Sequence, residues 1–197
     1  MVNVLVLRGA QGTNRAWAAY RRARAEAGLP KVTTDHFAYA GFVYVGDTHE
    51  EGVQVGSKLL WFLNTSLKSA PQYSKFLPGV LPPQFAPQVY RTAPPASAGA
   101  GGAASPGKPA ASAGQNAATL IGMTAEQAMK RGILFVCNPY TVHRQIMDFY
   151  GEVGGFGHLV LVGRTGFMTH AETEKSIKLF SKEVLPRLRA IAPVTVG

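Results

Sequence analysis

The strongest candidate for ligand chemistry is the segment Gly163-Arg164-Thr165-Gly166, which directly follows a predicted strand. Its glycines let backbone amides approach a ligand closely, and the Arg164 guanidinium can pair with an anion. In parallel β/α folds, ligands lie at the carboxyl ends of the strands, where this segment falls. We therefore take Gly163, Arg164 and Thr165 as candidate cofactor-binding residues. The alternative, that the glycines only make a turn, stays open.

A second candidate for anion binding is the N-terminus of a predicted helix. The backbone amides of Tyr140 and Thr141 lie in its first turn, an arrangement typical of phosphate sites. Cys137 precedes this helix, where a thiol pKa can be lowered. The sequence shows no partner that makes Cys137 a nucleophile, so it favours a small buried side chain there.

No metal site and no catalytic residue can be assigned from the sequence. None of the histidines has the spacing of a metal-binding motif, and we expect all of them to be structural. They are His36, His49, His143, His158 and His170. Neither GxxxxGK[ST] nor a GxGxxG directly after a strand is present, which disfavours a classical nucleotide-binding fold. No carboxylate pair and no Ser-His-Asp pattern stands out, so the catalytic residues are unknown.

The composition is that of a globular, basic chain. Of its 197 residues 46% are hydrophobic, and 20 Lys and Arg against 11 Asp and Glu give a net charge of +9. The cations are spread over both ends of the chain, and one cluster, at Arg15, Arg21, Arg22 and Arg24, is typical of the solvated face of a helix. We therefore expect no nucleic-acid partner, whereas an anionic cofactor or substrate is consistent with the charge.

The cysteine content and the length of the apolar runs indicate the cellular compartment. Cys137 is the only cysteine, which excludes an intrachain disulfide and fits a reducing compartment. The longest apolar runs are far below the ~18 residues of a membrane span, and residues 1–7 lack the basic region of a signal peptide. We expect a cytoplasmic protein with no membrane partner.

A low-complexity segment interrupts the regular structure. Residues 92–118 are almost entirely Ala, Gly, Pro and Ser, and we interpret them as a flexible, disordered insert. The prolines and aromatic residues of 71–90 predict an extended loop before it. The predicted organisation is one domain: two β/α units and the loop at 1–91, the insert at 92–118, and two further β/α units at 119–197.

Predicted strands alternate with predicted helices. Apolar runs rich in β-branched and aromatic residues predict strands at 2–7, 36–45, 133–136 and 158–162. Helix starts follow them at Thr13 or Asn14, at Thr48 with Glu51, at Asn138-Pro139, and at Thr169 with Glu172. This order indicates an α/β fold with a parallel sheet. We predict a TIM-barrel-like fold with about half of a (β/α)₈ barrel, since a complete barrel needs about 250 residues. A small open doubly wound sheet is the alternative.

The last predicted helix has one apolar face. Phe180, Val184 and Leu188 are spaced by four residues and should be buried. Pro186 falls inside this pattern and predicts a kink.

The segment from Ile133 to Ile191 resembles the C-terminal end of the bacterial luciferase-like flavin-dependent monooxygenases. The matching stretches are FVCNPYTVHRQI, GGFGHLVLVGRTGFMTH and KLFSKEVLPRLR. WAAYRRARAEAGLP and FVYVGDTHEEG are similar to the same family, more weakly. Together these stretches cover most of the chain that we expect to be ordered.

The resemblance implies a barrel enzyme that uses reduced flavin, either FMN or the deazaflavin F420, to oxygenate a small-molecule substrate. It covers only the last half of the family's length, so no catalytic residue can be carried over. We therefore expect a C-terminal fragment or one half of a split gene, which forms a homo-oligomer or pairs with a separate N-terminal half.

Two other functions stay open at this point. One is a non-catalytic remnant or assembly subunit that keeps the interface but not the flavin pocket. The other is a small open-sheet protein that binds an anionic ligand at Gly163–Thr165.

Overall fold

The computed structural model describes residues 3–6, 8–61, 63, 122–191 and 195–196. By its internal contacts the chain divides into two units, Met1–Phe62 with Met123–Gly197, and Leu63–Gly122. Every helix and strand below belongs to the first unit. The predicted insert and the proline-rich loop lie outside the described residues, so both stay predictions, as do the domain boundaries drawn from them.

The first unit is built on a parallel four-stranded sheet. Its strands are β1 (Asn3–Val6), β3 (Phe37–Val45), β4 (Leu134–Cys137) and β5 (His158–Val162). The helices that follow them in turn are α1 (Gly9–Glu26), α2 (His49–Gly56), α7 (Pro139–Glu152) and α8 (His170–Leu179). The predicted α/β class with parallel β/α units is confirmed, in the arrangement of a partial TIM-barrel-like fold.

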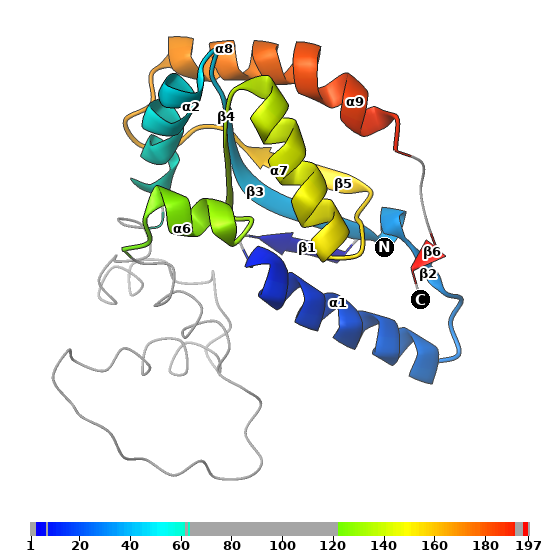
Figure 1. Ribbon diagram of the computed structural model, residues 1–197. Coiled ribbons are helices and arrows are strands. Elements are labelled where there is room, and N and C mark those ends of the chain that lie inside the picture. Colours follow the sequence, from blue (N-terminus) through cyan, green and yellow to red (C-terminus); the bar gives the residue numbers. More distant parts are fainter. Residues whose placement is uncertain (1–2, 7, 62, 64–121, 192–194, 197) are drawn as a thin grey trace, which may run out of the picture. The chain divides into compact units, whose positions relative to one another are not determined.

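Strand β3 is the centre of this sheet and runs between β1 and β5 (Figure 1). Residues 38–40 of β3 pair with both of these strands, which must therefore lie on opposite edges of β3. Phe42 pairs with Leu134 of β4 and with Val162 of β5, so β4 shares an edge with β1. In a closed barrel β5 would neighbour β4. Here β3 has nine residues, enough for two short strands end to end on one edge, and β5 takes the other edge.

Shorter elements complete the unit. A two-stranded antiparallel sheet, which the sequence did not predict, joins β2 (Val32–Thr33) to β6 (Thr195–Val196). The 3₁₀ turns η1 (Thr34–His36) and η2 (Ser57–Leu60) precede β3 and follow α2, and α6 (Ala125–Lys130) precedes β4. Among the helices that the structure describes, none is long and apolar enough to cross a membrane.

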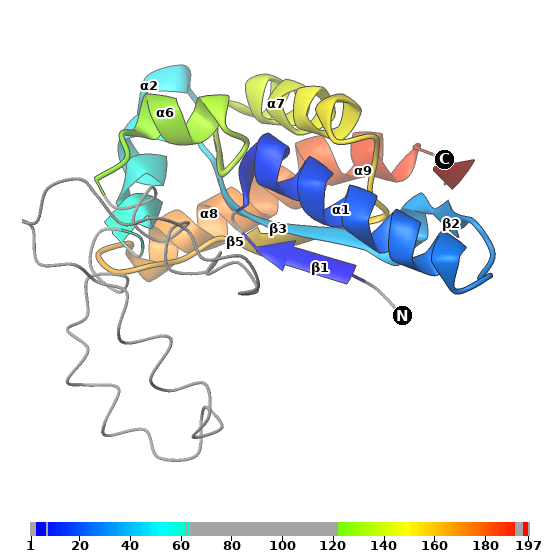
Figure 2. The same cartoon turned by 90° about the horizontal axis from the view of Figure 1, so that it is seen from below.

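The main core packs α1 and α7 against the same face of the sheet (Figure 2). Trp17 of α1 lies 4.6 Å from Phe37 between ring centroids, and Tyr39 lies 4.4 Å from Phe149 of α7. The buried Tyr39 hydroxyl donates to the Gly132 carbonyl at 2.7 Å. Burial raises the pKa of this hydroxyl far above its usual value, so Tyr39 stays neutral and acts as a structural donor.

Helix α1 begins at Gly9, earlier than predicted. The predicted cap at Thr13 or Asn14 is wrong, because no side chain caps this helix and Thr13 is buried within it. The amides of the first turn find distant partners instead. The Gly9 N–H donates to the Tyr39 hydroxyl at 3.2 Å, and the Ala10 N–H donates to the Arg131 carbonyl at 3.1 Å. Partners so far along the chain leave no local sequence signal.

The caps predicted for the later helices are confirmed at Asn138 for α7 and at Thr169 for α8. At α2, Thr48 accepts the Glu51 N–H at 3.2 Å as predicted. The reciprocal bond of the predicted capping box does not form there. The Glu51 carboxylate accepts the N–H of Asp47 instead, at 3.0 Å.

The predicted kink in the last helix takes the form of a π-helical turn. Between α8 and α9 (Leu185–Arg189), residues Phe180–Val184 form the π-helix η5, which ends two residues before Pro186. Proline lacks the N–H of an α-helical bond, and its ring crowds the preceding turn, which the wider π turn accommodates. Phe180 and Val184 are buried as predicted, whereas Leu188 is only half-buried.

Candidate functional site

The carboxyl ends of the parallel strands lead into loops at 46–48, 138 and 163–169. In β/α folds this edge of the sheet binds ligands. The predicted cofactor-binding residues Gly163, Arg164 and Thr165 lie in the last of these loops. Their role in cofactor binding stays a prediction.

The loop after β5 is fixed to the chain that follows α2. The Thr165 hydroxyl lies 3.2 Å from each of the carbonyl oxygens of Lys58 and Leu59, to which it donates. Gly166 has φ +47°, and a Cβ there would lie 2.6 Å from the Trp61 ring. The Trp61 ring in turn meets Phe167 edge-on at 5.8 Å. Packing therefore requires Gly166, and Thr165 is a positioning residue for this loop.

Gly163 and Arg164 have no such structural task. A Cβ on Gly163 would meet only the Val43 carbonyl oxygen, at 3.9 Å, so steric packing does not require a glycine. Arg164 is exposed and has no ion-pair partner within the part of the chain that the structure describes. A cation held on a fixed loop at the carboxyl end of a strand is suited to bind an anionic group.

The second predicted anion site is not supported. The Thr141 N–H already donates to the Asn138 side chain at 2.9 Å, which caps α7. Pro139 has no N–H to offer. Only the Tyr140 amide is left in the first turn, and a single amide makes a poor phosphate cradle.

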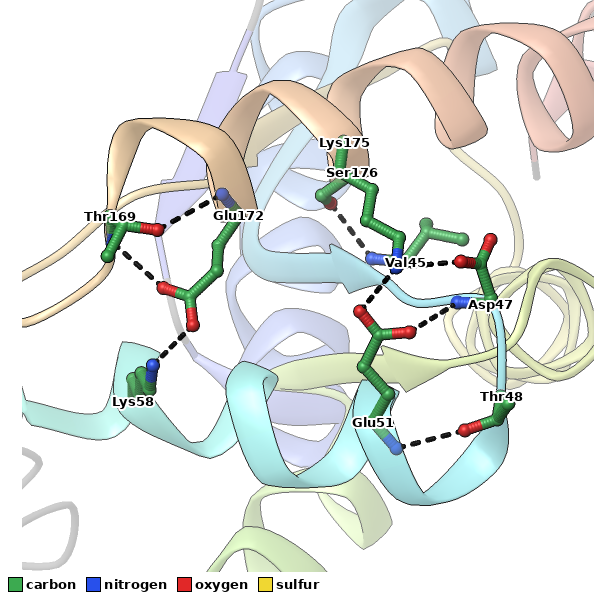
Figure 3. A network of polar contacts seen from close by, with 9 residues as sticks. All are labelled: Val45, Asp47, Thr48, Glu51, Lys58, Thr169, Glu172, Lys175 and Ser176. Carbon is green, nitrogen blue, oxygen red and sulfur yellow. Dashed lines mark hydrogen bonds and ion pairs between the residues drawn. The ribbon is translucent and has the colours of Figure 1, made fainter.

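An ion-pair network joins α8 to α2 and to the residues that flank it, Asp47 before it and Lys58 in η2 (Figure 3). The Lys175 Nζ lies 2.7 Å from the Asp47 Oδ2 and 2.6 Å from the Glu51 Oε1. One turn earlier on α8, Glu172 accepts from Lys58 at 2.5 Å. The carboxylates of Asp47 and Glu51 raise the pKa of Lys175 above its usual value, and the bond from Lys58 lowers the pKa of Glu172. Each charge is paired, so the network holds the two helices together.

Tyr44 lies within the electrostatic reach of this network. Its side chain is fully buried near the end of β3, and among the residues that the structure describes its hydroxyl has no hydrogen-bond partner. Burial, followed by the nearby Glu51 carboxylate, raises the pKa of Tyr44 to about 12. The hydroxyl is therefore a neutral donor. No sequence pattern indicated this role, because Tyr44 falls within an ordinary apolar strand pattern.

The structure brings Cys137 and His49 together, which sequence reasoning missed. The Cys137 Sγ lies 2.8 Å from the His49 Nδ1, although the residues are 88 positions apart. Cys137 is 1% exposed, as the sequence favoured, and burial raises the pKa of its thiol. At neutral pH the thiol is therefore protonated, and the contact with His49 does not make Cys137 an activated nucleophile.

The other histidines show no metal-binding arrangement. His36 accepts the Thr33 N–H at 3.2 Å and so closes the turn before β3. Across the described ranges, no group of three or more His, Cys, Asp or Glu side chains could hold a metal ion.

Comparison with solved structures shows the relatives of this fold. Monooxygenase RslO1 from Streptomyces bottropensis superposes with a TM-score of 0.56 and 17% identity, over 95% of this chain and 42% of that one. The chain shares its fold. The oxygenating constituent of 3,6-diketocamphane monooxygenase from the CAM plasmid of Pseudomonas putida, a type II Baeyer-Villiger monooxygenase in complex with FMN, gives a TM-score of 0.56 and 19% identity. That superposition covers 93% of this chain and 42% of the other.

A third solved structure is less similar. The coenzyme F420-dependent tetrahydromethanopterin reductase from Methanopyrus kandleri gives a TM-score of 0.48 and 14% identity, over 95% of this chain and 46% of that chain. This chain thus spans less than half of the length of each of the three. No protein-family model and no curated protein sequence matches it.

Proposed function

We propose that this chain belongs to an oxidoreductase of the luciferase-like flavin-dependent monooxygenase class and contributes part of a flavin site. The observation that carries the proposal is the superposition of nearly the whole chain on two monooxygenases, one of them solved with FMN. The sequence resemblance of 133–191 to the same class supports it independently. At this level of identity the superposition establishes the fold, and the activity is our inference from it.

The residues at the carboxyl ends of the strands fit one part of a flavin. Arg164 is exposed and unpaired within the described chain, so it can bind the phosphate of FMN or of a deazaflavin. Gly163 leaves room for close approach beside it, and Thr165 fixes the loop through the carbonyls of Lys58 and Leu59. When bound, a reduced flavin supplies the electrons that activate molecular oxygen. The chain's own contribution is to hold and orient the phosphate end.

The remainder of such a site lies in sequence that this chain does not match. Because the chain spans 42% of each monooxygenase, we propose that a further polypeptide segment completes the flavin and substrate pocket. A separate N-terminal half is one source of that segment, and a second copy of this chain is another.

A flavin titration tests the proposal. Reduced FMN and a reduced deazaflavin are added anaerobically to the purified chain, and the protein fluorescence is followed. We expect binding of one of them, and Arg164→Ala should weaken it about tenfold, as for the loss of a charge-assisted hydrogen bond. Arg22→Ala removes an equal charge from α1 and should leave the affinity unchanged. Equal affinities of the two variants would remove Arg164 from the site.

A non-catalytic assembly subunit is the second candidate function. The observation that favours it is the exposure of apolar residues along β5, where Val160 is 47% exposed. If the chain shows no measurable affinity for either flavin in the titration, the result would support the assembly subunit and contradict the proposed flavin-dependent enzyme.

A further inference from the structure

Strand β5 has the composition of a buried strand and the position of an edge strand. It pairs with β3 on one side, and among the described residues no strand pairs with its other side. Val160 is 47% and Leu161 is 39% exposed, and as neighbours in a strand they point to opposite faces. Apolar residues on both faces are typical of a strand whose two faces are covered by other parts of a protein. An open edge of this kind favours pairing with another strand.

The unpaired backbone groups of this edge belong to Leu159 and Leu161. The Phe42 N–H donates to the Ile133 carbonyl directly before β4, so the N–H and C=O groups of the preceding Gly41 point toward β5. Gly41 is in register with Leu161, and in a parallel pair its bonds go to the residues on either side of that partner. The N–H and C=O of Leu161, and by alternation those of Leu159, therefore point away from β3.

A groove of about 610 Å³ opens over the same strand. Leu159 and Leu161 line it together with side chains of α7 and of the last helix, among them Ile177 and Leu185. Ile177 is 57% exposed although it belongs to an otherwise apolar helix face. Side chains of an added strand thus have an apolar surface to cover on this face of the sheet.

Two unpaired charges of opposite sign flank β5. Asp35 lies against its amino end, because a Cβ on Gly157 would lie 2.6 Å from the Asp35 Oδ1. Arg164 follows its carboxyl end. Both side chains are exposed, and neither has an ion-pair partner within the described chain.

We propose that a second copy of this chain occupies the edge, with the two β5 strands antiparallel about a two-fold axis at Val160. This register sets Leu159 of one protomer opposite Leu161 of its partner, so the free backbone groups pair and the apolar side chains meet. It also brings Arg164 of each protomer to the end of the partner's β5 where Asp35 lies. Each copy carries a net charge of +9, which opposes association, and the two crossed ion pairs offset that repulsion locally. The dimer goes beyond the proposed function and does not require a flavin. It engages Arg164 in an ion pair, so a flavin phosphate bound at Arg164 would compete with this contact.

A charge exchange tests this geometry. Light scattering over a concentration series should give twice the 21.0 kDa of one chain for the natural sequence. Arg164→Asp faces each Asp35 with an aspartate, and Asp35→Arg faces each Arg164 with an arginine. Each variant alone should dimerise roughly tenfold more weakly. An equimolar mixture of the two variants restores both ion pairs in the mixed dimer and should regain the mass. Arg22→Asp changes the net charge of α1 equally and should stay dimeric.

The backbone contacts have their own test. Leu161→Pro removes an N–H that points away from β3, so circular dichroism should show a folded chain while light scattering shows a monomer. A natural chain that stays monomeric throughout the series overturns the proposal. So does a dimer whose strength is unchanged in both charge variants, or a mixture that associates no better than either variant alone.

Discussion

The Val45 N–H donates to the Ser176 Oγ at 2.9 Å, which fixes the end of β3 to α8 (Figure 3). Strand β5 ends opposite Phe42, so β3 runs on beyond it, and no strand of the described chain pairs with that edge there. The hydroxyl of Ser176 takes the place of the missing strand carbonyl. Through this bond the last helix completes the carboxyl edge of the sheet, where the candidate site lies.

Ser176→Ala should destabilise the protein by about 1–3 kcal/mol, because it leaves the buried Val45 N–H without an acceptor. Urea denaturation gives the free energy of unfolding. Ser181→Ala is the matched control, since Ser181 is exposed and donates only to the Lys178 carbonyl of its own helix. The control should change the stability by less than about 0.5 kcal/mol. A cost for Ser176→Ala as small as that of the control would mean that water replaces the hydroxyl.

Two glycine substitutions should change the stability of the protein in opposite directions. A Cβ on Gly52 of α2 would lie 2.4 Å from the Cα of Cys137, so Gly52→Ala forces α2 away from β4 and should cost about 1–3 kcal/mol. Gly151 lies in α7 with no atom within 4 Å of an added Cβ, and Gly151→Ala should stabilise by about 0.5–1 kcal/mol. Thermal and urea unfolding of both variants check this. Equal effects would contradict the close packing of α2 on β4.

Phe180 and Ile177 compare a buried and an exposed position on the apolar face of the last helix. Phe180 is 6% exposed and belongs to the main core, so Phe180→Ala should cost about 3–5 kcal/mol. Ile177→Ala, at a residue 57% exposed, should cost less than about 1 kcal/mol in a monomer. Urea denaturation at low protein concentration, where the chain is monomeric, gives the free energy of unfolding of each variant. A cost below ~1 kcal/mol for Phe180→Ala would place that face of the helix in solvent.

Glu172 should contribute to the acid stability. Lys58 and the Thr169 N–H lower its pKa below the usual 4.5, so the folded state binds its proton less readily than the unfolded state. The stabilisation is therefore present above pH 4.5 and is lost as the pH falls through the folded pKa. Melting temperatures measured from pH 7 to pH 3 should show a gap between the natural protein and Glu172→Gln that closes at the acid end.

A matched control for the acid series is Glu126→Gln. The Glu126 side chain is 74% exposed and meets Lys130 only across one turn of α6. Exposed pairs of this kind contribute little. We expect its melting curve to follow that of the natural protein at each pH, and a gap as large as that of Glu172→Gln would assign the effect to net charge.

Local patterns predicted the strands and most of the helix starts. Apolar runs, capping side chains and the Asn138-Pro139 pair each lie within a few neighbouring residues of the sequence. The predictions failed where contacts between residues far apart in the sequence determine the structure. Helix α1 begins at Gly9 because Tyr39 and Arg131 accept its first amides. The order of the strands, with β5 beside β3, likewise depends on tertiary pairing that no window contains.

At the candidate site, the sequence predicted the loop after β5 but not the different roles of its residues. A turn rich in glycine after a strand marked Gly163–Gly166, and the structure separates Thr165 and Gly166, which hold the loop, from Arg164, which faces solvent. No sequence pattern indicated the contact of His49 with Cys137 or the burial of the Tyr44 hydroxyl, which has no partner in the described part of the chain. Each arises from residues brought together only by the fold.

The dissociation constant of reduced FMN, measured anaerobically on a sample whose mass is determined by light scattering, tests the central claim most directly. If the chain supplies only part of a flavin site, it should bind reduced FMN more weakly than low-micromolar, and it should consume no oxygen beyond free flavin. Addition of the segment that completes the pocket should tighten the binding. A monomer of 21.0 kDa that binds reduced FMN in the low-micromolar range and oxygenates a substrate would contradict the account, because these β/α units would then suffice for the whole site.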